Sequence, residues 1–267
     1  MKIGVVGCTG RMGRMVVAEI TGTGGCELAG GTESAGHPKL GEDVSTVAGL
    51  AASGLKVSDD PAALFSASDA VIDFTVPEAT LHHAGLAADS STALVAGTTG
   101  MGDEQVSALG RAAARAPIVL APNFSAGVNL LLGLTEQVAG VLGEDFDIEI
   151  VEMHHKHKVD APSGTALGLG EAAAKGRGVG LNQVADRGRD GITGERQPGR
   201  IGFAALRGGD VVGEHTVVFA GAGERIELTH KAASRVIFAR GAVRAALWTE
   251  GRPAGLYSMM DVLGFGS

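Results

Sequence analysis

Five consecutive side chains that carry or exchange protons, from His154 to Lys158, stand between a strand-like run and a helical run. The run from Ile148 to Val151 is mainly apolar and β-branched, which predicts a strand. In the segment from Asp160 to Thr165, Pro162 ends the extended chain, and Ser163 is placed to cap the following helix. The first turn of a helix attracts anions through its free N–H groups and its dipole. The stretch therefore predicts a site that protonates and holds a small acidic molecule.

Other readings stay open when this stretch is considered alone. A basic run is ordinarily a solvated surface or a nucleic-acid patch, and a serine before a helix is ordinarily only a cap. His154 and His157 are close enough in sequence to share a metal ion, with Glu152 or Asp160 as a third ligand and no cysteine nearby. We expect no metal, and the net charge of −8 disfavours nucleic acid as the main partner.

A second motif at the start of the chain favours the ligand-binding reading. The apolar run Ile3–Val6 leads into Gly7-Cys-Thr-Gly-Arg-Met-Gly13, and a helical run follows from Arg14 to Ile20. Glycines at this spacing allow a tight turn and a close approach of the backbone to a pyrophosphate. A second strand is predicted from Glu27 to Gly31, and Glu33 at its end can accept from ribose hydroxyls. Together they predict a dinucleotide-binding βαβ unit.

Strands and helices continue to alternate, which predicts a parallel, doubly wound sheet. Ligands of such sheets bind at the carboxyl ends of the strands, where we expect the nicotinamide. Three predicted strands (residues 70–74, 93–96 and 118–121) end in polar, small or aromatic residues: Phe74-Thr75, Gly97-Thr98-Thr99 and Asn123-Phe124. His82 and His83 fall inside the predicted helix 77–88, and we interpret both as surface or packing residues.

The second half of the chain predicts a different domain. An apolar helix over residues 128–142 leads into it, and the arginine-rich segment 176–200 lacks periodicity and is interpreted as a long loop, either a lid or an oligomer contact. No helical run separates the three strand-like segments that follow, so their sheet need not be parallel; they span residues 202–206, 211–219 and 224–229. A last helix is predicted over 233–247 and a tail over 256–263.

Composition agrees with a cytoplasmic enzyme. The chain has 267 residues, enough for two modest domains, and its two cysteines fit a reducing compartment. No run approaches the ~18 uninterrupted apolar residues of a membrane span. The first residues predict a strand rather than a signal peptide.

Both motifs together make the sequence resemble the 4-hydroxy-tetrahydrodipicolinate reductase family, also called dihydrodipicolinate reductases, over nearly the whole chain. Gly7–Gly13 is similar to the family's nucleotide loop, and Glu152–Ala166 is similar to its long and specific signature. Shorter similar segments are Asp73–Thr75, Ala96–Gly100, Pro122–Asn129, Gly213–Thr216 and Thr229–Ala232.

The resemblance implies an α/β fold with two domains. An N-terminal Rossmann-type domain with a doubly wound parallel sheet would span residues 1–125 and be completed by 236–267. A mixed α/β domain for substrate binding and tetramerisation would span 126–235. The partners implied are a small cyclic dicarboxylate substrate and identical subunits in a homotetramer, with no nucleic acid and no membrane.

The resemblance also implies a role for each matching residue. His154 would be the acid/base and Lys158 the proton donor, and substrate carboxylates would be held by His155, Gly164 and Thr165. NADH or NADPH would be held by residues of four segments: Gly7, Cys8, Thr9, Gly10, Arg11, Met12, Glu33, Gly97, Thr98, Thr99, Ala121, Pro122, Asn123 and Phe124.

The implied reaction is the NAD(P)H-dependent reduction of 4-hydroxy-tetrahydrodipicolinate, via dihydrodipicolinate, in diaminopimelate and lysine biosynthesis. Hydride addition to the cyclic imine builds negative charge at the far end of its conjugated system, and an acid must quench that charge. An ordinary histidine, with a pKa near ~6.5, can supply this acid at neutral pH.

Two alternative functions remain. Another NAD(P)H-dependent dehydrogenase of a small dicarboxylate would share the glycine loop but lack the long signature. A non-catalytic NAD(P)H-sensing protein would bind the cofactor without turnover, and the acidic balance argues against a DNA-docking version of it.

Cofactor choice depends on the residues after Glu33. A carboxylate is unfavourable beside a 2′-phosphate, which usually needs an arginine partner. The family often places a cation immediately after the acidic residue, and here that position is Ser34, with Lys39 as the nearest cation that follows in sequence. We therefore expect NADH to be used at least as well as NADPH.

Overall fold

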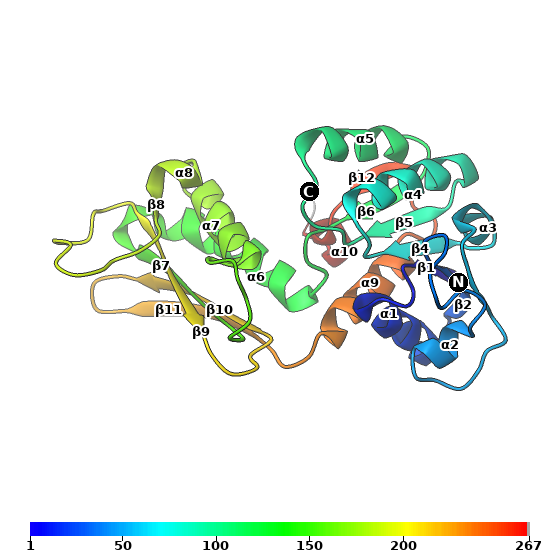
Figure 1. The fold of residues 1–267 in the computed structure, drawn as a ribbon. Helices are drawn as coiled ribbons and strands as arrows, with labels where there is room; N and C mark the ends of the chain where they lie inside the picture. Colours follow the sequence, from blue (N-terminus) through cyan, green and yellow to red (C-terminus); the bar gives the residue numbers. More distant parts are fainter. Residues whose placement is uncertain (266–267) are drawn as a thin grey trace. The chain divides into compact units, whose positions relative to one another are not determined.

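The computed structural model describes residues 1–265, and the chain divides into two compact units. The N-terminal unit combines Met1–Ser125 with the chain from Val236 onward, and the central unit is Ala126–Arg235. Each unit has its own sheet and its own helices (Figure 1).

The N-terminal unit contains one seven-stranded sheet in which every neighbouring pair of strands is parallel. Across the sheet the order is β12-β6-β5-β4-β1-β2-β3. After β3 the chain returns and places β4 on the other side of β1, so a topological switch point lies between β1 and β4. The strands are β1 (Lys2–Val6), β2 (Glu27–Thr32), β3 (Val57–Ser58), β4 (Ala70–Asp73), β5 (Ala93–Ala96), β6 (Pro117–Leu120) and β12 (Gly255–Tyr257).

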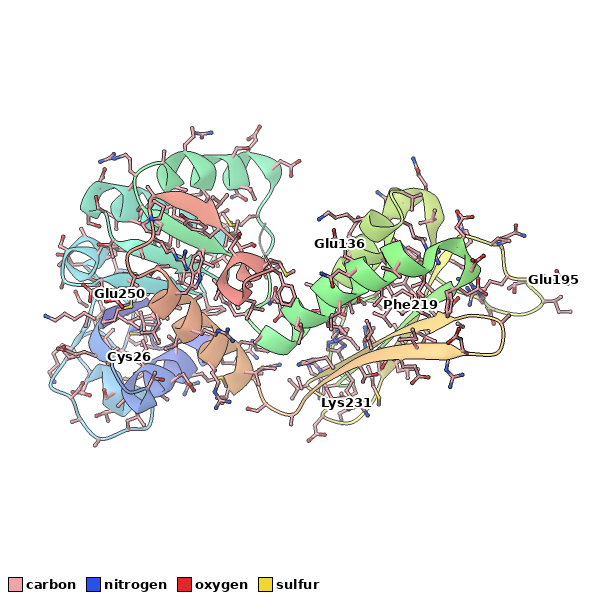
Figure 2. The ribbon with its side chains drawn as sticks, turned by 180° about the vertical axis from the view of Figure 1, so that it is seen from behind. Cys26, Glu136, Glu195, Phe219, Lys231 and Glu250 are labelled. Atoms are coloured by element: carbon pink, nitrogen blue, oxygen red, sulfur yellow. The ribbon has the colours of Figure 1, made fainter. Side chains whose placement is uncertain are left out.

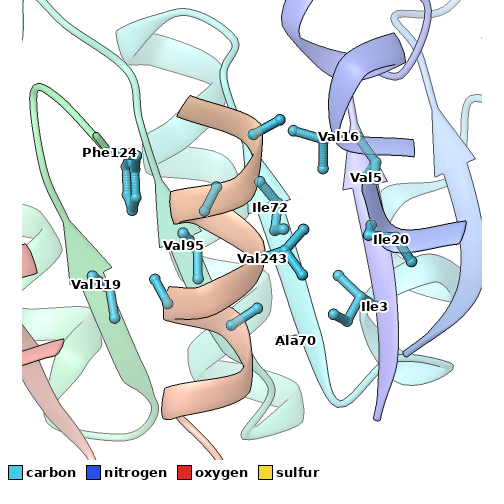
Figure 3. Packing of buried hydrophobic residues seen from close by; sticks show 14 of the residues in the cluster. Ile3, Val5, Val16, Ile20, Ala70, Ile72, Val95, Val119, Phe124 and Val243 are labelled. Atoms are coloured by element: carbon cyan, nitrogen blue, oxygen red, sulfur yellow. The ribbon is translucent and has the colours of Figure 1, made fainter. Parts of the chain in front are cut away.

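Helices cover both faces of this sheet because successive strand residues point to opposite sides. Ile72 and Val95 pack in one cluster with α1 (Arg11–Gly22) and α9 (Val236–Trp248), and Figure 3 shows Val243 of α9 over these strands. The adjacent residues Val71 and Leu94 pack in a second cluster with α3 (Pro61–Ser66), α4 (Pro77–Ser90) and α5 (Asp103–Ala113). The predicted Rossmann-type parallel sheet is confirmed.

The structure also contains elements that the sequence analysis did not predict. Between residues 33 and 69 lie the short helix α2 (Val44–Val47), strand β3 and helix α3. The predicted tail contains the edge strand β12 and the short helix α10 (Met259–Leu263). Elements of two to six residues are too short to show a period in the sequence.

The central unit contains a five-stranded mixed sheet, and the mixed α/β domain that the family resemblance implied is confirmed. The order of the sheet is β11-β10-β7-β9-β8. Strand β7 pairs in parallel with β9 and antiparallel with β10, so it occupies the middle of the sheet. The strands are β7 (Asp147–His154), β8 (Ala185–Asp186), β9 (Ile201–Arg207), β10 (Gly213–Ala220) and β11 (Arg225–Ala232).

Two helices, α6 (Ala126–Leu142) and α7 (Gly164–Gly176), pack on each other and on this sheet. Phe219 of β10 lies among their buried side chains (Figure 2). Residues Ala126–Asp145 are long and apolar enough to cross a membrane by length and composition alone. Buried residues of α6 belong to the core of the central unit, however, as expected for the core helix of a globular domain.

Residues 176–200 are not the uniform loop that the sequence predicted. They contain the short helix α8 (Leu181–Val184) and strand β8. Two arginines after β8 also bind side chains of β7. Arg189 and Arg196 both donate to the Glu149 carboxylate, at 2.7 and 2.8 Å. Ionic side-chain contacts of this kind have no sequence period, so the sequence does not predict the order that they produce.

Candidate functional site

The carboxylate of Glu152, near the end of β7, is buried and receives hydrogen bonds from three directions. The Nδ1 atom of His154 lies 2.7 Å from Oε2, and the backbone N–H of Ser163 donates to Oε1 at 3.0 Å. The guanidinium of Arg207 donates to both oxygens, at 2.6 and 2.8 Å. One carboxylate therefore fixes the end of β7, the end of β9 and the start of α7.

Several hydrogen bonds to Glu152 favour its charged form. Burial alone would raise the pKa of this carboxyl, but hydrogen bonds from Arg207, His154 and Ser163 outweigh burial and lower the pKa. The hydrogen bonds between Arg207 and Glu152 also raise the pKa of Arg207. Glu152 is thus an ionised, acceptor-only group at neutral pH.

An ionised Glu152 fixes the tautomer of His154. Because the carboxylate can only accept, Nδ1 of His154 must carry a proton, and Nε2 is the atom that can gain or lose one. A Cβ atom at Gly213 would lie 3.0 Å from this Nε2, so the glycine leaves that edge of the ring uncrowded. The arrangement equips His154 for proton transfer at Nε2.

The start of α7 forms as the sequence predicted, with Ser163 as its cap. The Ser163 hydroxyl accepts from the N–H of Ala166 at 3.1 Å, and it lies 3.0 Å from Nε2 of His215. Burial, with a smaller effect of nearby His154, lowers the pKa of His215 to about 4. A neutral His215 can accept a hydrogen bond from the Ser163 hydroxyl through Nε2, and this bond holds the capping residue in place. Gly164 and Thr165 are the first residues of the helix.

The five-residue basic run does not continue the strand. Strand β7 ends at His154, and Lys158 N–H donates to the carbonyl of His155 in a turn. The Lys158 ammonium lies 2.8 Å from Asp160, and this hydrogen bond is the main reason for the lowered pKa of Asp160. Nδ1 of His155 is buried without a hydrogen-bond partner within residues 1–265. Three members of the run are half-buried, namely His154, His155 and Lys158, and the other two, Lys156 and His157, are exposed.

No group of three or more histidine, cysteine or acidic side chains within residues 1–265 could hold a metal ion. Of the ligands considered from the sequence, Glu152 and Asp160 are instead engaged with Arg207 and Lys158.

The glycine-rich loop of the N-terminal unit has the shape that a pyrophosphate requires. Gly7 adopts a positive φ of 63°, and a Cβ at Gly13 would lie 2.7 Å from Cα of Cys8, so only glycine allows helix α1 to approach the strand. Gly10 caps α1 with no side-chain hydrogen bond, which leaves the N–H groups of its first turn available to an anion. The loop therefore fits the phosphates of a dinucleotide.

Glu33 follows β2 and is attached to this loop. Its Oε1 accepts from the N–H and the hydroxyl of Thr9, at 3.0 and 2.8 Å. Cys8 is buried, and a Cβ at Gly31 would lie 2.7 Å from its sulfur. Burial, and then the charge of Glu33, raise the pKa of Cys8 to about 12. The Cys8 side chain thus serves packing, and only its backbone is available to a ligand.

The structure brings together the strand ends that the sequence singled out. Phe74 lies edge-on to Phe124 with ring centroids 5.6 Å apart, and its ring occupies the space beside Gly97. Thr98 is buried, and its hydroxyl lies 2.6 Å from that of Thr80. Of the remaining candidates in these loops, Thr99 and Pro122 are exposed, Asn123 is half-buried and Ala121 is buried. In the glycine loop, Arg11 is exposed and Met12 is half-buried.

Sequence reasoning missed some residues of these sites. Glu152 was considered only as a metal ligand, although its i, i+2 spacing from His154 on a strand places both on one face. Arg207 lies 55 residues from Glu152 in the sequence and carries no local signal. His83 was interpreted as surface or packing; it is buried, as a packing residue would be, and in addition its Nδ1 lies 2.8 Å from a buried Asp73 carboxylate oxygen.

Known proteins match nearly the whole length of the chain. The family description "Dihydrodipicolinate reductase, N-terminus" matches residues 1–124, and "Dihydrodipicolinate reductase, C-terminus" matches residues 127–263. The 4-hydroxy-tetrahydrodipicolinate reductase of Ruegeria pomeroyi is 57% identical over 260 residues, which is 97% of each chain. That of Rhodopseudomonas palustris (strain BisA53) is 55% identical over 267 residues, which is 100% of this chain and 98% of the relative.

A solved structure shows the same fold at lower identity. Dihydrodipicolinate reductase from Paenisporosarcina sp. TG-14, bound to dipicolinate, has a TM-score of 0.78 at 24% identity and covers 98% of both chains.

The parallel sheet, its glycine loop and the matches over both units define a nicotinamide-dependent oxidoreductase. The chain belongs to the dihydrodipicolinate reductase family, whose members use NADH or NADPH. The resemblance seen in the sequence is confirmed.

Proposed function

We propose that this enzyme reduces the cyclic imine derived from 4-hydroxy-tetrahydrodipicolinate to tetrahydrodipicolinate, in diaminopimelate and lysine biosynthesis. The curated relatives at 55–57% identity carry this activity in their names. The observation that carries the proposal is the Glu152 carboxylate, which binds both His154 Nδ1 and the Ser163 N–H. A proton donor and an anion-binding helix start are thereby held by the same group.

His154 acts as the acid in this proposal. Bound NADH or NADPH supplies the hydride, and the negative charge that builds on the substrate is quenched by a proton from His154 Nε2. Glu152 holds the Nδ1 proton in place, so the ring cannot present the wrong tautomer.

Lys158 supports the same step as a positive charge beside the substrate, which stabilises the negative charge until His154 transfers its proton. Its ammonium is paired with Asp160, whose side chain is more than half exposed. A surface carboxylate is a weak competitor for the ammonium because solvent screens the pair. A substrate carboxylate can therefore replace Asp160 as the partner of Lys158.

Two anchors hold the substrate carboxylates in this proposal. The backbone N–H groups of Gly164 and Thr165, in the first turn of α7, form one anchor. His155 forms the other, because a buried polar atom such as its Nδ1 ordinarily has a partner.

A two-anchor site predicts strong discrimination between inhibitors. Pyridine-2,6-dicarboxylate should inhibit competitively against the substrate, and pyridine-2-carboxylate should bind at least tenfold more weakly, because it fills only one anchor. Inhibition constants for both compounds, measured at one salt concentration, provide the test. Equal inhibition by the two compounds would refute the two-anchor site.

The cofactor would be held by the N-terminal unit. The backbone from Gly7 to Met12 would bind the pyrophosphate, and Glu33 would accept from the ribose hydroxyls through Oε2, which has no hydrogen bond within the described residues. The loops at Gly97–Thr99 and Ala121–Phe124 would line the nicotinamide end, at the carboxyl edge of the sheet.

Cofactor preference gives a test of the ribose position. Wild-type enzyme should use NADH at least as well as NADPH, because a 2′-phosphate would meet the Glu33 carboxylate and Ser34 offers it no positive charge. Ser34→Arg should raise kcat/KM for NADPH about tenfold and leave that for NADH nearly unchanged. A strong wild-type preference for NADPH that survives Lys39→Ala would contradict this ribose pocket.

A metal-free mechanism predicts that chelators have no effect. The acid is a histidine fixed by Glu152, and no step of the proposal needs a Lewis acid. Activity should be unchanged after dialysis against EDTA. Activity that is lost on chelation and restored by Zn²⁺ would contradict the proposal.

We further propose a soluble cytoplasmic homotetramer that binds neither nucleic acid nor membrane. Strand β11 is an edge strand on which side chains such as Ile226 are exposed, and the central sheet is the surface through which subunits would associate. Light scattering of the purified protein tests the subunit number.

A further inference from the structure

A completely buried carboxylate lies at the switch point of the N-terminal sheet. Asp73 is the last residue of β4, it is 0% exposed, and it pairs in register with Val6 of β1. Val6 is the residue directly before the glycine loop. The carboxyl group at this position stands next to the loop without facing solvent.

Asp73 uses both oxygens to fasten the turn that follows β4. Oδ1 accepts from the backbone N–H of Thr75 at 2.8 Å and from its hydroxyl at 2.6 Å. Oδ2 lies 2.8 Å from Nδ1 of His83, which is buried on helix α4. Since a carboxylate only accepts, Nδ1 of His83 carries the proton, and α4 donates to the strand end through this bond.

The fastened turn packs directly against the glycine loop. A Cβ at Gly7 would lie 2.9 Å from the Cγ2 methyl group of Thr75. Gly7 has a positive φ, so it sets the direction of the loop, and Thr75 closes the space beside it. The hydrogen bonds of Asp73 therefore limit where the loop can move.

Helix α4 makes a second buried polar contact to the same edge of the sheet. Thr80, one turn before His83, bonds to Thr98 in the loop after β5. The helix thus holds two strand-end loops by two side chains, and Phe65 stacks on His83 with ring centroids 6.1 Å apart.

We propose that Asp73 and His83 are positioning residues for the cofactor: the buried pair holds Thr75 against Gly7 and so pre-forms the pyrophosphate loop. This inference rests on the proposed cofactor site. Pre-formed loops bind more tightly because less ordering is needed when the ligand arrives. Loss of the pair should weaken cofactor binding and leave the chemistry at His154 unchanged.

Three histidine variants separate this role from simple packing. His83→Leu fills the space without a donor, and His83→Asn places an N–H donor at the position of Nδ1. His82→Leu is the matched control, because His82 is the exposed neighbour on the same helix. The dissociation constant of NADH is measured by fluorescence titration, together with kcat and the inhibition constant of pyridine-2,6-dicarboxylate.

His83→Leu should raise the dissociation constant of NADH roughly tenfold, and His83→Asn should restore most of that loss. His82→Leu should match wild type. In His83→Leu, kcat at saturating NADH and inhibition by the dicarboxylate should stay within about twofold of wild type. Unchanged NADH binding in folded His83→Leu, or equal losses in the Leu and Asn variants, would overturn the proposal.

Two further variants keep the test decisive. Thr75→Val preserves the side-chain shape and removes only the hydroxyl that donates to Asp73, so it should weaken NADH binding even if His83→Leu does not fold. Suppose that Thr75→Val binds NADH with wild-type affinity and that His83→Asn misfolds as His83→Leu does. This result would contradict the proposed role of the Asp73–His83 pair. Gly10→Val tests the cofactor site itself, and unchanged NADH binding by this variant would show that the site is misplaced. If Gly10→Val loses NADH binding while the His83 and Thr75 variants keep it, the cofactor site stands and only the role of the pair is refuted.

Discussion

His154→Gln should lower kcat by roughly 10²–10⁴, the usual range for loss of a general acid. Glutamine can still donate a hydrogen bond to Glu152, so the fold should survive, but it cannot release a proton at neutral pH. The measurement is the initial rate of reduced-cofactor oxidation at saturating substrate, with circular dichroism to verify folding. Near-wild-type kcat would show that His154 is not the acid.

Matched variants of the same basic run make this result specific. Lys158→Met should also lose roughly 10²-fold or more in kcat, because the charge beside the substrate disappears. His157→Gln should behave like wild type, since His157 is exposed on the turn and lies outside the Glu152 network. If all three variants lost activity equally, the run would act as a general basic patch and the assignment of His154 would fail.

Glu152→Gln should damage activity and stability together. The substitution keeps the size of the side chain but removes the charge that fixes His154 Nδ1 and pairs with Arg207. We expect kcat to fall about 10²-fold, because the histidine is no longer held in one tautomer. We also expect the free energy of unfolding to fall by about 1–3 kcal/mol, because buried hydrogen-bond partners lose their acceptor charge.

The stability effect of Glu152→Gln should depend on pH. Hydrogen bonds hold the pKa of folded Glu152 below its ordinary value, so its stabilisation is fully present above the unfolded pKa of about 4.3. The difference in unfolding free energy between wild type and variant should therefore shrink as the pH falls below about 4.3. Denaturant titrations at several pH values provide the measurement, and a difference that grows on acidification would contradict it.

Glu149→Gln is the matched control for this variant. Glu149 lies on the same strand and is also bound by arginines, but it is part of the contact with residues 189–196 rather than of the His154 network. It should lower stability and leave kcat unchanged. Equal loss of kcat in both variants would show that the effect of Glu152 is only structural.

The sequence predicted the parts of the molecule that have a period or a local motif. The Rossmann-type sheet, strands of the second sheet such as β7 and β10, and the Ser163 cap follow from apolar patterning and from residue types at fixed spacing. Short elements such as α8 and β12 lacked such a pattern; α8 is held by Arg200, which donates to the carbonyl of Gln183, and β12 by pairing with β6.

The sequence located the candidate sites more completely than it explained them. His154 and the Gly7 loop stood out by composition, but the residues that hold them in position did not. Glu152 meets Arg207 across 55 residues, and Asp73 meets His83 only because a strand end and a helix pack together. Such supports depend on tertiary contacts between ordinary residue types, so a single sequence carries no signal for them.

The central claim is tested most directly by turnover with the proposed substrate. The unstable substrate can be generated in situ from pyruvate and aspartate semialdehyde, and the absorbance of reduced nicotinamide is followed after the purified protein is added. We predict rapid oxidation of NADH that depends on both precursors, is blocked by pyridine-2,6-dicarboxylate and is nearly absent in His154→Gln. Tight NADH binding without any oxidation in the presence of substrate would contradict the account.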